Sequence, residues 1–275
     1  MKNRRPPFPK ISPSGKWVML TAYDAPTATL FHASGVDFLL VGDSVGMVLL
    51  GYPDTRPVTM DEMVHHAAAV RRGAPDAFVI GDLPLKGVER GPKQALESAQ
   101  RFIRDGRVDA VKIEWNKDAL AACERFKSAK IPFMGHTGLT PQQAAFEGGF
   151  RVHGKTAPEA KEILRQAEAF EKAGAFAVLL ECVPSVVAEA VTKRLKIPTI
   201  GIGAGSACSG QVLVWTDLAG LYVKMEPRFV RRYTDLDPFL ASAVREYVDD
   251  VRNGRFPSHQ ESFFMVESER KAFLR

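Results

Sequence analysis

The chain has 275 residues, of which 45% are hydrophobic, and it carries a formal net charge of +5 at pH 7. This composition supplies one sizeable hydrophobic core, so we expect a single domain. The positive residues alternate with acids and are not interleaved with aromatic side chains, which argues against a nucleic-acid-binding protein.

The chain opens on a basic arm, residues 1–16, in which five lysines and arginines meet no acid and four prolines prevent regular structure. We expect this arm to be flexible or to lie on a partner, and residues 17–275 to form the main domain. The arm lacks the apolar segment of a secretory signal, and no later run approaches the ~18 apolar residues of a membrane span, so a cytoplasmic location is expected. Cys123, Cys182 and Cys208 form no CxxC pair, and we interpret them as reduced packing residues.

Eight short apolar runs have the composition of buried strands. They cover residues 18–22, 38–42, 78–81, 110–113, 132–135, 176–180, 199–202 and 212–215. Helical patterns cover residues 26–34, 60–72, 94–105, 119–129, 156–172 and 186–195. Two of the helices begin with capping boxes, Thr59-Met-Asp-Glu62 and Thr156-Ala-Pro-Glu159. The alternation predicts an α/β fold, a (β/α)8 TIM barrel, for which ~250 residues is the usual size.

Past the eighth run the sequence predicts a C-terminal extension of the barrel. Residues 238–251 have a helical pattern, and an irregular tail containing Phe263, Phe264 and Met265 follows. Because this tail is apolar, we expect it to pack on the barrel or on a neighbouring subunit.

Most of the expected strands end on a residue that could carry chemistry, and in a barrel of this kind working residues collect at the carboxyl ends of the strands. At those ends, or one residue beyond, stand Asp24, Asp43, Asp82, Glu114, His136 and Glu181. Side chains alternate along a strand, so Lys112 and Glu114 point to the same side. A buried ion pair seldom stabilises a fold by itself, and the neighbouring acids therefore favour a functional role for both.

Asp43, Asp82 and Glu114 would repel one another unless a positive group lies among them. An all-oxygen set suits a hard divalent cation, and Mg²⁺ is the default expectation. Zinc is disfavoured, because only His136 is near and zinc prefers His and Cys. Lys112 would hold an anionic substrate or neutralise a carboxylate.

Glu181 lies outside this cluster and is free to act as a base. A metal that polarises a carbonyl makes the neighbouring C–H acidic, and a carboxylate can then remove the proton and leave a metal-stabilised enolate. The residues therefore predict carbon–carbon chemistry next to a carbonyl. His136 follows a buried strand, and both a structural and a catalytic role are open for it.

Other motifs do not predict sites. Residues 149–156 match the P-loop string, but no strand pattern precedes them. Gly201-Ile-Gly-Ala-Gly205 lacks the third glycine of a dinucleotide loop and is interpreted as a tight turn. His32, His65 and His66 fall in expected helices and are interpreted as surface or packing residues.

Several motifs resemble those of the ketopantoate hydroxymethyltransferase family, over about residues 17–264. They are Leu20-Thr-Ala-Tyr-Asp24, Leu40-Val-Gly-Asp-Ser-Val-Gly-Met47, Pro57-Val-Thr-Met-Asp-Glu-Met63, Val111-Lys-Ile-Glu114, Met134-Gly-His-Thr-Gly-Leu-Thr-Pro-Gln142, Leu180-Glu-Cys-Val-Pro184, Ile200-Gly-Ile-Gly-Ala-Gly205 and Gly210-Gln-Val-Leu-Val-Trp215. The resemblance implies a (β/α)8 enzyme that transfers a hydroxymethyl group from 5,10-methylenetetrahydrofolate to 3-methyl-2-oxobutanoate. The product would be 2-dehydropantoate, for pantothenate and coenzyme A synthesis.

The resemblance also implies roles for single residues. Mg²⁺ would be bound at Asp43 and Asp82, with Glu114 in the same metal environment, and Glu181 would abstract the proton. The substrate-binding set would be Asp43, Ser44, Asp82, Lys112 and His136. The enolate would then attack the methylene carbon. Family members typically form homodecamers, in which the C-terminal tail would find a place to dock.

Two stretches depart from the family pattern, residues 85–91 and Trp115-Asn116. Both are expected on loops at the catalytic mouth, where loops set substrate choice. A paralogue that acts on another 2-oxo acid, or that has altered folate contacts, is therefore an alternative. A lyase or mutase like the phosphoenolpyruvate and isocitrate lyase barrels is disfavoured, since the chain lacks their Lys-Lys-Cys-Gly-His stretch. A non-catalytic binding protein is disfavoured by the intact acids and Lys112.

Overall fold

Eight parallel strands close into a barrel in the order β1-β2-β3-β4-β5-β6-β7-β8, as the sequence predicts. The structure is a computed structural model that describes residues 15–144, 149–221 and 227–275. The strands are β1 Trp17–Thr21, β2 Phe38–Val41, β3 Phe78–Asp82, β4 Ala110–Glu114, β5 Phe133–Gly138, β6 Ala177–Glu181, β7 Thr199–Ile202 and β8 Gly210–Leu213. The expected arm falls mostly on residues 1–14, outside the described residues.

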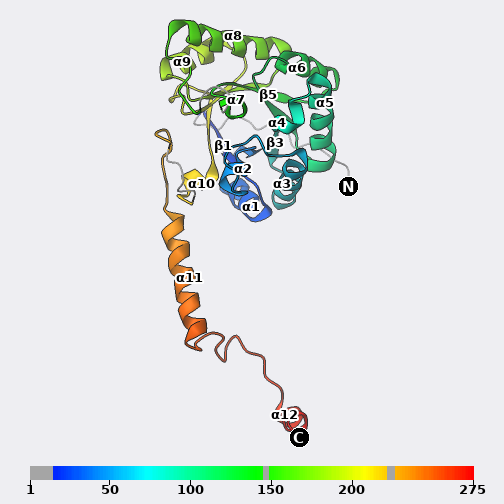
Figure 1. The fold of residues 1–275 in the computed structure, drawn as a ribbon, viewed down its shortest axis with the longest axis vertical. Helices are drawn as coiled ribbons and strands as arrows, with labels where there is room; N and C mark the ends of the chain where they lie inside the picture. Colours follow the sequence, from blue (N-terminus) through cyan, green and yellow to red (C-terminus); the bar gives the residue numbers. More distant parts are fainter. Residues whose placement is uncertain (1–14, 145–148, 222–226) are drawn as a thin grey trace.

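Helices surround the strands (Figure 1). The longer ones are α1 Ala25–Ala33, α3 Met60–Gly73, α5 Pro92–Arg101, α6 Ala119–Ser128, α8 Ala157–Ala173, α9 Ser185–Arg194, α11 Leu236–Arg252 and α12 Glu267–Phe273. Four-residue helices are α2 Val45–Val48, α4 Leu85–Val88, α7 Pro141–Ala144 and α10 Trp215–Leu218, and a π-helical turn, η1 Phe102–Gly106, follows α5. No helix in the described part of the chain is long and apolar enough to cross a membrane.

The helix starts follow the local sequence signals. Both predicted capping boxes are confirmed, with Thr59 and Thr156 each accepting a bond from the backbone three residues on. Asp24, which gains no catalytic role, caps α1 by accepting a bond from Thr27 N at 2.8 Å. Gly174 ends α8 in the left-handed conformation, at φ 100°.

The barrel interior is layered. Trp17, Phe38 and Phe78 fill the amino end, with successive ring centroids 5.6 Å apart and nearly perpendicular planes. Alternation along β4 turns Ala110 inward, while Val111 and Ile113 join the apolar layer between strands and helices. The same alternation brings Lys112 and Glu114 inward at the carboxyl end. The aromatic rings therefore fill the amino end of the barrel, and the polar side chains lie at the carboxyl end.

The prediction for the eighth strand is wrong by two residues. The apolar run 212–215 continues into α10, because Trp215 N donates to Thr21 Oγ1 at 3.0 Å and the chain turns there. The strand itself begins at Gly210, opposite Trp17. Only residues 203–209 join β7 to β8, without the helix that separates other neighbouring strands. The outer face of β8 and β1 is consequently less covered, and Val18 is 50% exposed.

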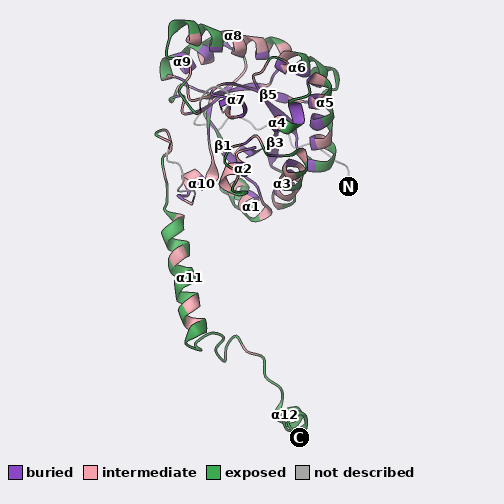
Figure 2. Ribbon diagram, in the orientation of Figure 1, coloured by how far each residue is buried: buried purple, intermediate pink, exposed green. Residues whose placement is uncertain are grey.

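The C-terminal extension does not pack on its own barrel. Figure 1 and Figure 2 show α11 running away from the strands, and none of the residues of α11 or α12 is buried. The first half of the expectation for the tail is therefore wrong. The second half, docking on a neighbouring subunit, stays a prediction.

Candidate active site

One cavity of about 320 Å³ opens at the carboxyl end of the barrel. All the predicted site residues line it, namely Asp43, Ser44, Asp82, Lys112, Glu114, His136 and Glu181. Strand register accounts for this grouping, because Asp82 pairs with Lys112 and Glu114 pairs with His136 across neighbouring strands. Residues separated by tens of positions in the sequence thus meet at one end of the sheet.

Lys112 lies among the carboxylates. Its Nζ is 2.8 Å from Oδ1 of Asp82, and both side chains are almost fully buried. The backbone N of Asp43 donates to Oδ2 of Asp82 at 3.4 Å. Burial alone lowers the pKa of Lys112, but the carboxylates of Asp82, Glu114 and Asp43 outweigh it and raise that pKa above its ordinary value. The lysine is therefore a permanent cation.

The carboxylates carry more negative charge than Lys112 can balance. Burial, and next the Asp82 carboxylate, raise the pKa of Asp43 to about 8. Burial also raises the pKa of Glu114 well above its usual range, although Lys112 acts in the opposite direction. Further positive charge near either carboxyl would act against burial and lower its pKa.

These residues fit a hard cation by chemistry. Glu114 Oε1 is buried and accepts no hydrogen bond from the described residues. Within the described ranges, no group of three or more His, Cys, Asp or Glu side chains is arranged to hold a metal ion by itself. Mg²⁺ commonly uses one or two protein carboxylates together with water and substrate oxygens, so a preassembled trio is not required.

His136 connects Lys112 to Glu181. Lys112 Nζ lies 3.1 Å from Nδ1 of His136, and Nε2 lies 3.2 Å from Oε2 of Glu181. Burial, and next the Lys112 charge, lower the pKa of His136 well below its usual value, so the ring is neutral. A neutral ring that accepts at Nδ1 from Lys112 carries its proton on Nε2, facing Glu181. The Nε2 contact is close, but it is not aligned as a full hydrogen bond.

Glu181 has the properties of a base that works near neutral pH. Burial raises its pKa to about 7, while Lys112 acts to lower it. It ends β6 and is only 17% exposed at its side chain. A carboxylate with this pKa exchanges protons readily at neutral pH. The sequence placed Glu181 apart from the acidic cluster, and His136 is what joins the two.

Sequence reasoning missed the residues that make hydrogen bonds to the site residues. Gln142, at the start of α7, donates through Nε2 to Asp43 Oδ2 at 2.8 Å and to Leu83 O at 2.9 Å, and its backbone N donates to Glu114 Oε2 at 3.1 Å. Tyr23 OH lies 2.8 Å from Ser44 Oγ. Gln142 closes one of the motifs that resemble those of the family, and that position is the signal in the sequence that could have drawn attention to this uncharged side chain.

The outer part of the cavity is mostly apolar. Phe150, Phe229 and Val214 line it together with Asp217, which the sequence reasoning also missed. Gly203 has φ 62°, and a Cβ there would lie 2.9 Å from the Phe229 ring. The glycine segment 201–205 thus makes a turn, as predicted, and also leaves room for Phe229.

The cysteines are free thiols, as predicted. Cys123 and Cys208 are buried packing residues, but Cys182 is half-buried and lines the cavity beside Glu181. Its φ of 47° is unusual for a residue with a side chain. The interpretation of Cys182 as a packing residue is therefore incomplete.

The two stretches that depart from the family pattern surround a second cavity of about 580 Å³. Leu85, Val88 and Glu89 line one wall and Trp115 and Asn116 another. None of these residues lines the main cavity. The backbone between them, from Gly138 to Pro141, contributes alternate residues to the two cavities.

Residues 149–156, the P-loop match, include the N-cap of α8 at Thr156, and the segment before them lies outside the described residues.

Residues 9–259 match the family model described as ketopantoate hydroxymethyltransferase. A protein of Oleidesulfovibrio alaskensis named 3-methyl-2-oxobutanoate hydroxymethyltransferase is 51% identical over 92% of this chain and 88% of its own length. A Clostridium novyi protein of the same name is 44% identical over 98% of both chains.

Solved structures show the same fold at low identity. Phosphoenolpyruvate phosphomutase from Streptomyces platensis is 16% identical, with a TM-score of 0.58 over 94% of this chain and 95% of that one. A 2,3-dimethylmalate lyase of the phosphoenolpyruvate mutase and isocitrate lyase superfamily is 17% identical, with a TM-score of 0.57 over 90% of this chain and 87% of that one. At this identity the likeness extends to the barrel alone.

Proposed function

The chain belongs to the ketopantoate hydroxymethyltransferase family, and we propose that it transfers a hydroxymethyl group from 5,10-methylenetetrahydrofolate to 3-methyl-2-oxobutanoate, giving 2-dehydropantoate. This reaction would supply pantothenate and coenzyme A synthesis. The observation that carries the proposal is the contact chain from Lys112 through His136 to Glu181 beside buried carboxylates. It provides an anion partner and a base at one end of one cavity.

The substrate oxygens would meet the polar end of the cavity. Asp43 and Asp82 would hold Mg²⁺, with Glu114 in the same environment, and the bound ion would polarise the 2-oxo group and make the C3 proton more acidic. Lys112 attracts the negative charge of the oxo acid, and the Ser44 hydroxyl is within reach of the same cavity. Tyr23 OH shares a hydrogen bond with that hydroxyl.

Proton removal falls to Glu181. Its carboxylate takes the C3 proton, and the neutral ring of His136 lies beside that carboxylate, with Nε2 3.2 Å from Oε2. The electron pair left at C3 forms the new carbon–carbon bond to the one-carbon unit of the donor. Water supplies the hydroxyl oxygen, and tetrahydrofolate leaves. His136 is thus a positioning residue, which is our choice between the two roles left open by the sequence.

The test is exchange of the C3 proton of 3-methyl-2-oxobutanoate with deuterated water, followed by NMR, with and without Mg²⁺ and without folate. We expect metal-dependent exchange that needs no folate, and product only when methylenetetrahydrofolate is added. Absence of metal-dependent exchange would overturn the proposed function.

Substrate choice is expected to match that of the named relatives. The unusual stretches 85–91 and Trp115-Asn116 lie around the second cavity and not around the main one, which supports an unchanged oxo-acid site. A panel of 2-oxo acids that differ in side-chain size checks this point. Faster turnover of another oxo acid than of 3-methyl-2-oxobutanoate would favour the paralogue instead.

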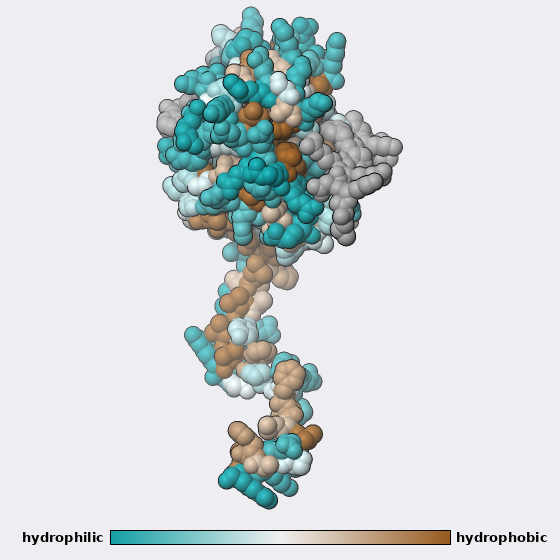
Figure 3. Space-filling view, turned by 90° about the vertical axis from the view of Figure 1, so that its right-hand side faces the viewer, coloured by the Kyte–Doolittle hydropathy of each residue, from teal (hydrophilic) through white to brown (hydrophobic). Residues whose placement is uncertain are grey.

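We also propose a homo-oligomer assembled through α11. Leu240, Val244, Tyr247 and Val251 recur at helical spacing on α11 and are all 45% exposed or more. Figure 3 shows hydrophobic residues along this projecting part of the chain. The outer face of β8 and β1 lacks a covering helix in the described structure, and a second copy of the chain offers α11 to fill that place. A homodecamer agrees with the family resemblance.

The free thiols Cys123, Cys182 and Cys208 support a reducing compartment, and we place the enzyme in the cytoplasm.

A further inference from the structure

The mouth of the main cavity has two chemically different sectors. The charged groups that the proposed reaction uses lie at the carboxyl ends of β2 to β6, from Asp43 to Glu181. The ends of β7, β8 and β1 contribute mainly apolar surface, including Ile202, Val212 and Val214. The oxo acid needs only the first sector, so the second is left for the other substrate.

One carboxylate stands in the apolar sector. Asp217, in α10 just after β8, lines the cavity and is half-buried. Its side chain receives no hydrogen bond from residues that the structure describes. Burial raises the pKa of Asp217 to about 6, and the charge of Arg232 acts in the opposite direction. A carboxylate that is partly desolvated without a donor is costly unless a ligand supplies one.

The surroundings define what that ligand looks like. The phenyl rings of Phe150 and Phe229 line the same cavity, and Gly203 leaves the space that the Phe229 ring needs. Apolar walls with a single carboxylate fit a flat heterocycle that presents two neighbouring N–H donors at one edge. The reduced pterin of a folate has such an edge in its N3–H and 2-amino groups, which match a carboxylate in a two-bond fork.

We propose that the apolar sector binds the reduced pterin ring of the one-carbon donor and that Asp217 accepts hydrogen bonds from its N3–H and 2-amino groups. The proposal rests on the proposed function and adds a residue that selects the donor. β8 lies across the eight-stranded barrel from β4, so a donor held at Asp217 faces an oxo acid held near Lys112 and Glu114. Asp217 would contribute to binding of the donor and not to removal of the C3 proton.

The experiment compares Asp217→Asn with Asp118→Asn. Asp118 is a half-buried carboxylate that lines the second cavity, so it is matched in chemistry and tests the other place where a folate could bind. Binding of tetrahydrofolate is measured by quenching of tryptophan fluorescence, and C3 exchange of the oxo acid is measured without folate. We expect Asp217→Asn to weaken tetrahydrofolate about 10- to 100-fold and to leave C3 exchange within about twofold. Asp118→Asn should change neither.

A 2-deamino analogue of tetrahydrofolate sharpens the test. The wild-type chain should bind it much more weakly than tetrahydrofolate, whereas Asp217→Asn should hardly distinguish the two ligands. Equal tetrahydrofolate affinity in Asp217→Asn and wild type overturns the proposal, as does a loss confined to Asp118→Asn. Loss of C3 exchange in Asp217→Asn also overturns it, because Asp217 would then act on the oxo acid. Failure of the wild-type chain to exchange the C3 proton or to bind tetrahydrofolate would instead overturn the proposed function itself.

Discussion

At the scale of single residues, the buried carboxyl groups of Asp109, Asp43 and Glu114 differ in how they are paired. Asp109 is buried, but it pairs with the Arg71 guanidinium and accepts a bond from Val79 N at 2.8 Å. Asp43 and Glu114 are equally buried, yet their pKa values are raised, because the bonds that they accept do not compensate for lost water. The paired Asp109 stabilises the fold, and the other two are poised to bind something positive.

Glu181→Gln should abolish C3 exchange, lowering its rate at least about 100-fold, because the amide cannot accept the proton. In the wild-type chain, the raised pKa of about 7 means that the carboxyl is protonated below that pH, so exchange should fall about tenfold per unit as the pH decreases below 7. The measurement is the NMR exchange rate from pH 5 to 9. Glu124→Gln, on the exposed surface of α6, is the control, and normal exchange by Glu181→Gln would show that the base is misassigned.

Asp43→Asn should make the metal-free chain more stable at pH 8 and remove much of its stabilisation by Mg²⁺. The pKa of Asp43 is raised from 3.8 to about 8 in the folded chain. Between pH 3.8 and about 8 the unfolded state therefore binds fewer protons than the folded state, and the free energy of unfolding falls as the pH rises. A neutral isostere removes that loss, and we expect Tm without metal to increase by roughly 2–6 °C. Thermal unfolding at pH 5 and pH 8, with and without Mg²⁺, tests this. An equal metal-induced shift in variant and wild type would remove Asp43 from the metal site.

At the scale of elements, the site depends on the short helix α7 as much as on the strands. α7 begins shortly after β5, the strand that carries His136. Its Gln142 donates to Asp43 after β2, to Leu83 O after β3 and to Glu114 at the end of β4. Three separate strand ends are thereby held together by one uncharged side chain and its backbone. Such supports commonly affect metal affinity almost as much as the ligands do.

Gln142→Met keeps the length of the side chain but removes the donor to Asp43. Without that donor the pKa of Asp43 should rise further, so protons compete better with the metal. We expect Mg²⁺ affinity to fall about 10-fold, with the loss shrinking as the pH increases. Calorimetric titration of Mg²⁺ at two pH values measures it. The neighbouring Gln143→Met, in the wall of the second cavity, is the matched control. A pH-independent loss would mean that Gln142 acts on folding and not through Asp43.

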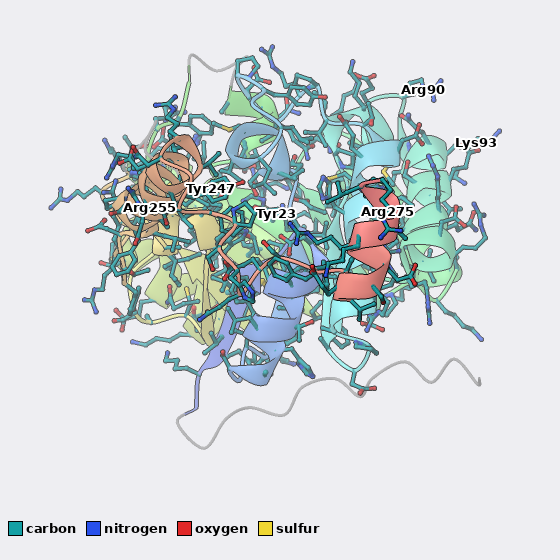
Figure 4. The ribbon with its side chains drawn as sticks, turned by 90° about the horizontal axis from the view of Figure 1, so that it is seen from below. Tyr23, Arg90, Lys93, Tyr247, Arg255 and Arg275 are labelled. Atoms are coloured by element: carbon teal, nitrogen blue, oxygen red, sulfur yellow. The ribbon has the colours of Figure 1, made fainter. Side chains whose placement is uncertain are left out.

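At the scale of the whole molecule, the projecting extension is the main unexplained feature of a single chain. Figure 4 looks along this segment, with Tyr247 and Arg255 labelled on it. An amphipathic helix whose apolar face meets only water is unfavourable, and association with another copy removes that cost.

Val244→Asp should therefore dissociate the oligomer, since it places a charge in the middle of the apolar face. Ser242→Asp adds the same charge on the opposite face of α11 and should leave the assembly unchanged. Light scattering after size-exclusion chromatography gives the mass of each variant. A wild-type monomer, or an unchanged assembly in Val244→Asp, would contradict assembly through this face.

The sequence by itself determined the strand–helix alternation, the closed barrel and the charged residues at the strand ends, because these depend on local periodicity and on where parallel strands stop. It placed Lys112 and Glu114 on one side of β4, which is confirmed. Only the tertiary structure decided that Gln142 supports Asp43, that His136 joins Lys112 to Glu181, and that Asp217 faces the same cavity. Closure of the barrel pairs β8 with β1 and so brings together side chains that are far apart in the sequence. No local sequence pattern encodes contacts between such distant residues.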